Sequence, residues 1–384
     1  MRTFRPATVD EVAAAMRETA GLAVTIRGAG TKRGWGPPPR ASDAVLDMSG
    51  LDRIIEHAAG DMVVQVEAGV PLGRLAAAVA EAGQQLAVDI PVYDDGSSLA
   101  GGTVGGALAV AVSGPRRLRY GGLRDLLLGV TLVRADGVVA HSGGKVVKNV
   151  AGYDLGKLLT GSYGTLAAIA TATLRLHPLP AATRYATVTV DTPAAAYERA
   201  AAWHASQLLP SAVELDRPAG GPITLAALFE GTADGVAARA AEAAAAVGGE
   251  VLAAPPGWFG RWPGTPDDTL LQVTALPATL PELLGAIERA ADAAGLPAVV
   301  RGSTGLAILQ VGLPGEAPPE SVTGFLAALR AGLAGGSAVV VHSPVTDLDW
   351  WGPVNSGALA LMRRVKEQFD PEHRLSPGRF VGGI

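Results

Sequence analysis

The chain has 384 residues, no cysteine and a formal net charge of −5. This length allows two domains with large buried cores, and the negative charge argues against nucleic acid as the main partner. The lack of cysteine excludes disulfides, zinc–thiolate sites and iron–sulfur clusters within the chain. The N-terminal sequence shows no apolar signal region, so we expect a cytoplasmic protein.

The first elements lead to a glycine-rich loop. Thr8 and Glu11 have capping-box spacing and predict a helix to about residue 20, followed by a buried strand over 22–26. The sequence RGAGTKRGWG follows at 27–36. Its later glycines and three prolines forbid the helix that a Rossmann fingerprint requires. The backbone amides of residues 28–32 could cradle phosphate, or the segment could be an ordinary glycine turn.

Glycine also dominates the central segment, residues 101–178. Strands are expected before it at 44–48 and 62–67, with a helix between Pro71 and Gly83. The segment itself has glycine pairs separated by apolar runs of strand length, which disfavours helices and suits a backbone that closely approaches a ligand. A hairpin is predicted at 130–141 and a strand at 166–176. The uncharged stretch 96–115 is too polar and glycine-rich for a membrane span.

From residue 187 the pattern changes and then repeats. Strand and helix signals alternate in the order βαββαβ, with helices at 193–207 and 233–247. The same order recurs from residue 270, with helices at 281–294 and 319–333. This is a ferredoxin-like arrangement, present twice.

Four motifs carry a resemblance to a known family. They are SGPRR at 113–117, RDLLLG at 124–129, GGKVVKNVAGYDL at 143–155 and GSYGTL at 161–166. Together they resemble the FAD-binding domain of the vanillyl-alcohol-oxidase, or PCMH, type, and in particular the FAD-binding subunits of bacterial glycolate oxidases. The resemblance implies an α+β protein. A two-lobed PCMH-type FAD-binding domain would span residues 1–180 and an α/β cap with two ferredoxin-like repeats 181–342. A C-terminal segment, 343–384, would return to the FAD domain.

The resemblance also implies which residues bind FAD. The loop at 27–32 would hold the pyrophosphate, opposed by the glycines from 101 to 106. The full predicted set is Arg27, Gly28, Ala29, Gly30, Thr31, Lys32, Gly101, Gly102, Thr103, Gly105, Gly106, Ser113, Gly114, Tyr120, Gly121, Asp125, Lys148, Gly161, Gly164 and Ile169. Because no cysteine exists and no histidine occupies the glycine loop, we expect the FAD to be non-covalent.

Catalytic candidates follow from the chemistry of 2-hydroxy acids. The tail FDPEHRLSPGRF resembles a family motif that ends in N-P-G-K, with Ser376 and Arg379 replacing the asparagine and the lysine. Arg379 or Lys148 could place a cation near the flavin. Arg301 could bind the substrate carboxylate and His342 could take the hydroxyl proton. Each could instead be an ordinary surface or core residue. The aromatic residues Trp258, Phe259 and Trp262, between the two repeats, could pack or face the flavin.

The family's catalytic relatives carry a metal motif, H-x-G-D-G-N, that this chain lacks, so no metal site is predicted. The resemblance implies a complex with a homologous flavoprotein subunit and an iron–sulfur subunit, which oxidises glycolate and similar small 2-hydroxy acids. Such a chain would have no membrane span and could meet a membrane only through its partners. Two alternatives stay open: a self-sufficient FAD oxidase or dehydrogenase, and a flavin-holding subunit without its own activity.

Overall fold

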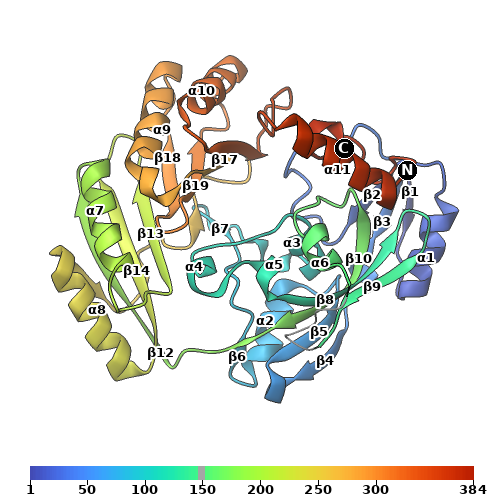
Figure 1. The fold of residues 1–384 in the computed structure, drawn as a ribbon, viewed down its shortest axis with the longest axis horizontal. Coiled ribbons are helices and arrows are strands. Elements are labelled where there is room, and N and C mark those ends of the chain that lie inside the picture. Colours follow the sequence, from blue (N-terminus) through green and yellow to red (C-terminus); the bar gives the residue numbers. More distant parts are fainter. Residues whose placement is uncertain (146–151) are drawn as a thin grey trace.

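A computed structural model describes residues 1–145 and 152–384 of the chain. Two lobes lie side by side (Figure 1). The N-terminal half of the sequence forms one lobe, the FAD lobe, and the α/β repeats form the other, the cap. Within the described residues, no helix combines the length and apolar character that crossing a bilayer would require.

The FAD lobe begins with a small parallel sheet. Its strand order is β1 (Arg2–Phe4), β3 (Ala44–Asp47) and β2 (Val24–Arg27). Helix α1 (Val9–Glu18) packs beside it and starts where the Thr8 side chain accepts a hydrogen bond from the Glu11 amide, as the capping-box spacing predicts. The glycine loop leaves the sheet at the end of β2.

A five-stranded antiparallel sheet forms the second half of this lobe. Its order is β4 (Ile54–Ala58), β5 (Val63–Glu67), β10 (Ala167–Arg175), β8 (Leu127–Arg134) and β9 (Val139–Gly143). The central strand β10 is buried along almost its whole length, which agrees with its unbroken apolar sequence. Strand β4 was not expected, since its short sequence IIEHA carries no clear alternation of apolar and polar residues.

Short elements connect the two sheets. The helices are α2 (Leu72–Ala80), α3 (Val104–Ala109), α4 (Arg117–Tyr120), α5 (Leu123–Leu126) and α6 (Leu155–Leu159). Two-residue strands pair as β6 (Gln84–Gln85) with β11 (His177–Pro178), and as β7 (Val92–Tyr93) with β16 (Arg261–Trp262). The second pair joins the two lobes.

Helix α3 corrects an expectation drawn from composition. Its glycines disfavour a helix, yet Thr103 caps the first turn by accepting a hydrogen bond from the Gly106 amide. A Cβ on Gly105 would lie only 2.8 Å from the Cβ of Ala68. The glycine is therefore needed for close packing on the neighbouring chain, and this tertiary contact outweighs helix propensity.

The cap is built on one eight-stranded sheet. Its order is β15 (Glu250–Leu252), β12 (Ala182–Val190), β14 (Ile223–Gly231), β13 (Ala212–Arg217), β18 (Val299–Ser303), β19 (Ile308–Leu313), β17 (Thr269–Thr274) and β20 (Ser337–His342). Each half is one predicted ferredoxin-like repeat. The repeats join through the antiparallel pairing of β13 with β18, so the cap is a single continuous layer.

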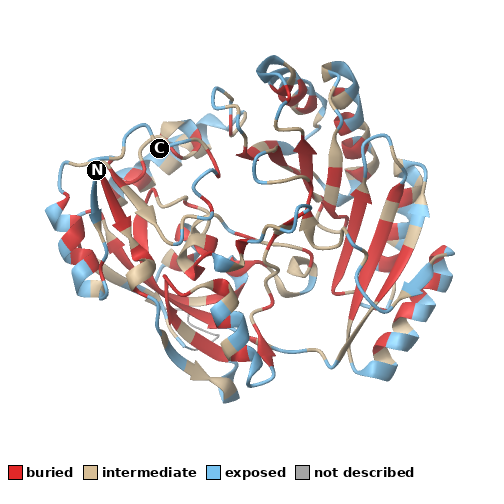
Figure 2. Cartoon of the chain, turned by 180° about the vertical axis from the view of Figure 1, so that it is seen from behind, coloured by how far each residue is buried: buried red, intermediate tan, exposed pale blue. Residues whose placement is uncertain are grey.

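Four helices cover the outer face of this sheet. They are α7 (Pro193–His204), α8 (Ala233–Val247), α9 (Leu280–Ala294) and α10 (Pro319–Gly332). Seen from behind, buried residues fill the strands while the outer sides of the helices are exposed (Figure 2). The other face of the sheet is left to meet the FAD lobe.

The C-terminal segment returns to the FAD lobe. Helix α11 (Ser356–Phe369) lies near the N-terminus (Figure 1). Beyond it, Leu375 forms a parallel bridge with Val24 of β2. Arg374 is buried and donates hydrogen bonds to the carbonyls of Met16 (2.6 Å) and Thr19 (2.8 Å). The last 30 or so residues of the chain therefore complete the edge of the first sheet.

Candidate functional site

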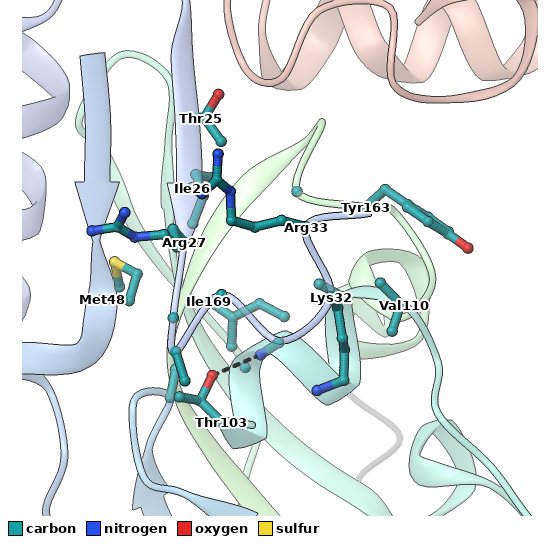
Figure 3. A pocket seen from close by; sticks show the side chains of 18 of the residues that line it. Thr25, Ile26, Arg27, Lys32, Arg33, Met48, Thr103, Val110, Tyr163 and Ile169 are labelled. Carbon is teal, nitrogen blue, oxygen red and sulfur yellow. Dashed lines mark hydrogen bonds between the residues drawn. The ribbon is translucent and has the colours of Figure 1, made fainter. Parts of the chain in front are cut away.

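A pocket of about 820 Å³, counting its open mouth, lies between the glycine loop, helix α3 and strand β10 (Figure 3). We call it the loop pocket. The predicted FAD-binding residues that line it are Arg27, Gly28, Ala29, Gly30, Thr31, Lys32, Thr103, Gly105, Gly106, Gly164 and Ile169, and the predicted catalytic residue Arg379 lines it as well.

The glycines allow two loops to meet. A Cβ on Gly28 would overlap the hydroxyl group of Thr103, and a Cβ on Gly102 would overlap the ammonium group of Lys32. Gly30 has a φ of +82°, a conformation that favours glycine. Residues 31–34 form turns rather than a helix. The loop is thus a run of backbone amides beside the pocket, as the sequence predicts.

The electrostatics of the loop pocket favour an anion. The Lys32 ammonium is buried, and its one hydrogen-bond partner in the described chain is the Thr31 hydroxyl at 3.1 Å. Arg33 also lines the pocket, whereas Arg27 pairs with Asp47 at 2.7 Å. Among the described residues, no aspartate or glutamate lines the pocket. A buried cation without a carboxylate partner fits a diphosphate, so these residues suit FAD.

Burial lowers the pKa of Lys32 from 10.5 to about 8. In the FAD-free chain its charge is lost as the pH rises through 8, and FAD affinity should then fall, by up to about tenfold per pH unit for one linked proton. Lys32→Met should weaken binding at pH 7 and remove most of this dependence. FAD titration of the stripped protein at pH 7, 8 and 9 measures both effects.

The control for this prediction is Lys157→Met, which removes an exposed lysine paired with Asp154. It should keep both the affinity and the pH dependence of the unchanged chain.

The stability of the FAD-free chain should rise with pH over the range in which FAD affinity falls. Because the pKa of Lys32 is lower in the folded than in the unfolded chain, stability rises with pH between about 8 and 10.5.

Arg379 reaches the loop pocket from the C-terminal segment. Its Nη2 donates hydrogen bonds to the carbonyls of Lys32 (3.0 Å), Arg33 (3.3 Å) and Trp35 (3.0 Å). Its Nε has no partner in the described chain. The predicted flavin contact stays a prediction, but these bonds give Arg379 a second role, which is to fix the shape of the glycine loop.

A second cavity lies between the lobes. It has about 540 Å³, counting its open part, and we call it the interlobe cavity. Ser113 and Gly114 line it from the FAD lobe, and Arg301 lines it from strand β18. Arg301 is held at 2.5 Å by both Asp216 and Asp94. Its charge is therefore already matched by two carboxylates, which weakens the prediction that it clamps a substrate carboxylate.

His342 is placed differently from the prediction. It is buried at the end of β20 and lines neither the loop pocket nor the interlobe cavity. Its Nε2 bonds with the Tyr93 hydroxyl at 2.9 Å and its Nδ1 with the Asp268 carbonyl at 2.8 Å. Burial lowers its pKa. Because both ring nitrogens are occupied, this geometry does not support a role as the base.

The remaining predicted residues lie around these sites. Tyr120 donates to Glu230 of the cap at 3.1 Å, and Asp125 accepts from the Gly122 amide at 2.9 Å. Both side chains therefore have structural partners. Lys148 lies outside the described residues. The others that line neither cavity are Gly101, Gly102, Gly121 and Gly161.

Sequence reasoning missed several residues of the interlobe cavity, among them Glu214, Ser303, Arg117 and Arg261. Strand β13 reads AVELDR, in which Glu214 and Asp216 alternate with apolar residues. That period of two indicates one polar face, and could have identified Glu214. The two arginines had no such signal, since arginine is common throughout the chain. Among the described residues, no cluster of His, Cys, Asp or Glu could hold a metal ion.

Comparison with known proteins agrees with this geometry. The family described as "FAD binding domain" matches residues 2–143, and "FAD linked oxidases, C-terminal domain" matches residues 353–380. The second match covers the tail motif. Glycolate oxidase subunit GlcE of Escherichia coli is 34% identical over 41% of this chain and 43% of its own length. D-lactate dehydrogenase of Archaeoglobus fulgidus is 35% identical over 45% and 38%.

Glycolate oxidase subunit GlcD of Bacillus subtilis is 32% identical over 50% of this chain and 40% of its own length. The chain thus spans about two fifths of the curated relatives it matches. A solved structure of alkyldihydroxyacetonephosphate synthase superimposes on 98% of the chain and 75% of its own, with a TM-score of 0.71 at 16% identity. That likeness confirms the α+β PCMH-type fold. Residues 2–143 thus match an FAD-binding domain and residues 353–380 the C-terminal domain of FAD-linked oxidases, and the two matches lie within one PCMH-type fold.

Proposed function

We propose that this chain is the FAD-binding subunit of a glycolate oxidase-like complex. The complex would oxidise small 2-hydroxy acids to 2-oxo acids and pass the electrons to an iron–sulfur subunit. The observation that carries the proposal is the loop pocket, where the buried Lys32 ammonium faces no carboxylate and two glycine loops meet. The relatives named for glycolate and D-lactate supply the substrate class.

Each part of the chain has a defined task in this proposal. Bound FAD supplies the acceptor for the hydride of the acid. Lys32 and Arg33 neutralise the pyrophosphate, and the amides of the glycine loop donate hydrogen bonds to it. Arg379 holds that loop through its carbonyls. The cap closes over the FAD lobe and excludes water from the interlobe cavity.

The FAD should be non-covalent. The chain has no cysteine, and no histidine lines the loop pocket among the described residues. Acid precipitation should therefore leave yellow flavin in the supernatant.

Dye reduction with glycolate and D-lactate tests the subunit role. It compares the chain alone with the chain in the presence of its flavoprotein and iron–sulfur partners.

We expect slow or no turnover by the chain alone and restored turnover with partners, because the chain lacks the H-x-G-D-G-N motif of the family's catalytic relatives and has no cysteine to hold an iron–sulfur cluster. Rapid turnover by the chain alone, unchanged by partners, would favour the self-sufficient oxidase instead. A flavin-holding subunit without its own chemistry is the other candidate. The engaged ring nitrogens of His342 favour it, and it predicts that Glu214 and Arg117 variants leave the turnover of the complex unchanged.

A further inference from the structure

The interlobe cavity contains two buried polar atoms that lack partners. Glu214 on β13 and Ser303 on β18 are cross-strand neighbours, and both line the cavity. The Oε1 atom of Glu214 and the Oγ atom of Ser303 are buried without a hydrogen-bond partner in the described chain. An unmet buried polar atom costs about 1–3 kcal/mol. Glu214 and Ser303 are near enough to interact with each other, and both line the cavity, so together they offer a polar edge to a ligand group.

Two cations line the same cavity with no carboxylate to match them. Arg117 donates to the Ser113 hydroxyl at 3.2 Å and Arg261 to the Tyr93 carbonyl at 3.0 Å. Neither forms an ion pair within the described residues. They differ in this from Arg301, which two aspartates hold, and from Arg116, which pairs with Asp89 at 2.7 Å.

The charge of Glu214 does not oppose an anion. Burial, aided by the nearby Asp89 carboxylate, raises the pKa of Glu214 well above its ordinary value. This shift favours the protonated carboxyl group, which can both donate and accept a hydrogen bond. The cavity lining thus includes two guanidinium groups without an ion pair in the described chain, together with a carboxyl group beside a hydroxyl.

We propose that the interlobe cavity binds a small 2-hydroxy acid, with Arg117 and Arg261 holding its carboxylate and with Glu214 and Ser303 bonding to its hydroxyl. The assignment rests on the proposed function for its substrate class. It replaces Arg301 by Arg117 and Arg261 as the carboxylate clamp. It makes Glu214 and Ser303 the residues that distinguish a 2-hydroxy acid from a plain carboxylic acid.

The test uses two acids that differ in one group. 2-Hydroxyisobutyrate has no hydrogen on C2, so it cannot be oxidised at that carbon, and isobutyrate lacks only the hydroxyl. Both are titrated calorimetrically into the FAD-loaded chain at pH 7. We expect the hydroxy acid to bind about five- to tenfold more tightly, the net value of one or two neutral hydrogen bonds.

The variants separate the two halves of the site. Arg117→Met and Arg261→Met should each weaken both acids by about tenfold or more and leave the preference for the hydroxyl intact. Ser303→Ala and Glu214→Leu should abolish that preference and leave isobutyrate affinity nearly unchanged. Arg199→Met removes an exposed arginine of α7 and should change nothing. FAD content and the thermal midpoint show that each variant is folded.

Several results would overturn the assignment: no binding of either acid, wild-type affinity in both arginine variants, or a hydroxyl preference that survives in both Ser303→Ala and Glu214→Leu. The binding and turnover experiments together distinguish failure of this assignment from failure of the proposed function. If the acids bind as expected but the complex oxidises no 2-hydroxy acid, the cavity assignment stands and the function falls. If the complex oxidises glycolate while the arginine variants bind normally, the function stands and this assignment falls.

Discussion

A Gly28→Val chain should lose most of its FAD while keeping its fold. Even the first carbon of a side chain at this position would overlap the hydroxyl of Thr103, so the glycine loop must move away from helix α3. Overpacking of this kind costs about 1–3 kcal/mol, which corresponds to a roughly five- to 150-fold loss of FAD affinity. The flavin-to-protein absorbance ratio after purification and an FAD titration measure the effect.

Gly34→Val is the matched control. Gly34 lies in the same loop, but it does not line the loop pocket, and a Cβ there would meet nothing within 4 Å. It should retain wild-type FAD content. Circular dichroism of both variants should be unchanged. Full FAD content in Gly28→Val would mean that the two loops do not meet across the cofactor site.

Lys366→Met should lower the free energy of unfolding of the FAD lobe by about 3–5 kcal/mol. The Lys366 ammonium is completely buried and binds Asp370 at 2.7 Å and the Thr165 carbonyl at 2.6 Å. Its removal leaves the Asp370 carboxylate buried with its charge unmatched. Urea unfolding, followed by flavin release and by tryptophan fluorescence, measures the loss and separates the lobes.

Two further variants test whether the loss of stability comes from the unmatched buried charge. Arg364→Met, on the exposed side of the same helix, should change the free energy of unfolding by less than about 0.5 kcal/mol. The double variant Lys366→Met with Asp370→Leu should recover much of the loss, because no unmatched charge remains. A single Lys366→Met variant as stable as the unchanged chain would contradict a buried ion pair at this position.

The sequence predicts the cap better than the sites. Each cap helix begins at a proline or another clear start signal and is flanked by strands of β-branched residues, so local signals and tertiary fold agree. Helices α8 and α9 match their predicted ranges to within one residue. The glycine loop was also recognisable, because the glycines and prolines of residues 34–39 rule out the helix that would follow a Rossmann loop.

The remaining features depend on contacts that local sequence does not encode. Helix α3 forms despite its glycines because Gly105 packs on Ala68. The engagement of His342 by Tyr93 depends on a residue 249 positions away in the chain. The polar face of β13 was visible as alternation, but its partner Ser303 comes from the other repeat. Pairing between repeats therefore decides which polar residues share a cavity.

The return of the tail to the FAD lobe also has a consequence for biosynthesis. Lys366, Arg374 and Arg379 complete the lobe, yet they are translated roughly 190 residues after its last strand, β10. At about 5–20 residues per second, the ribosome needs about 10–40 s for this interval. The cap repeats can fold on the nascent chain during that time. The FAD lobe cannot complete the edge of its first sheet until these residues have left the ribosome, so cofactor loading is expected to follow their synthesis.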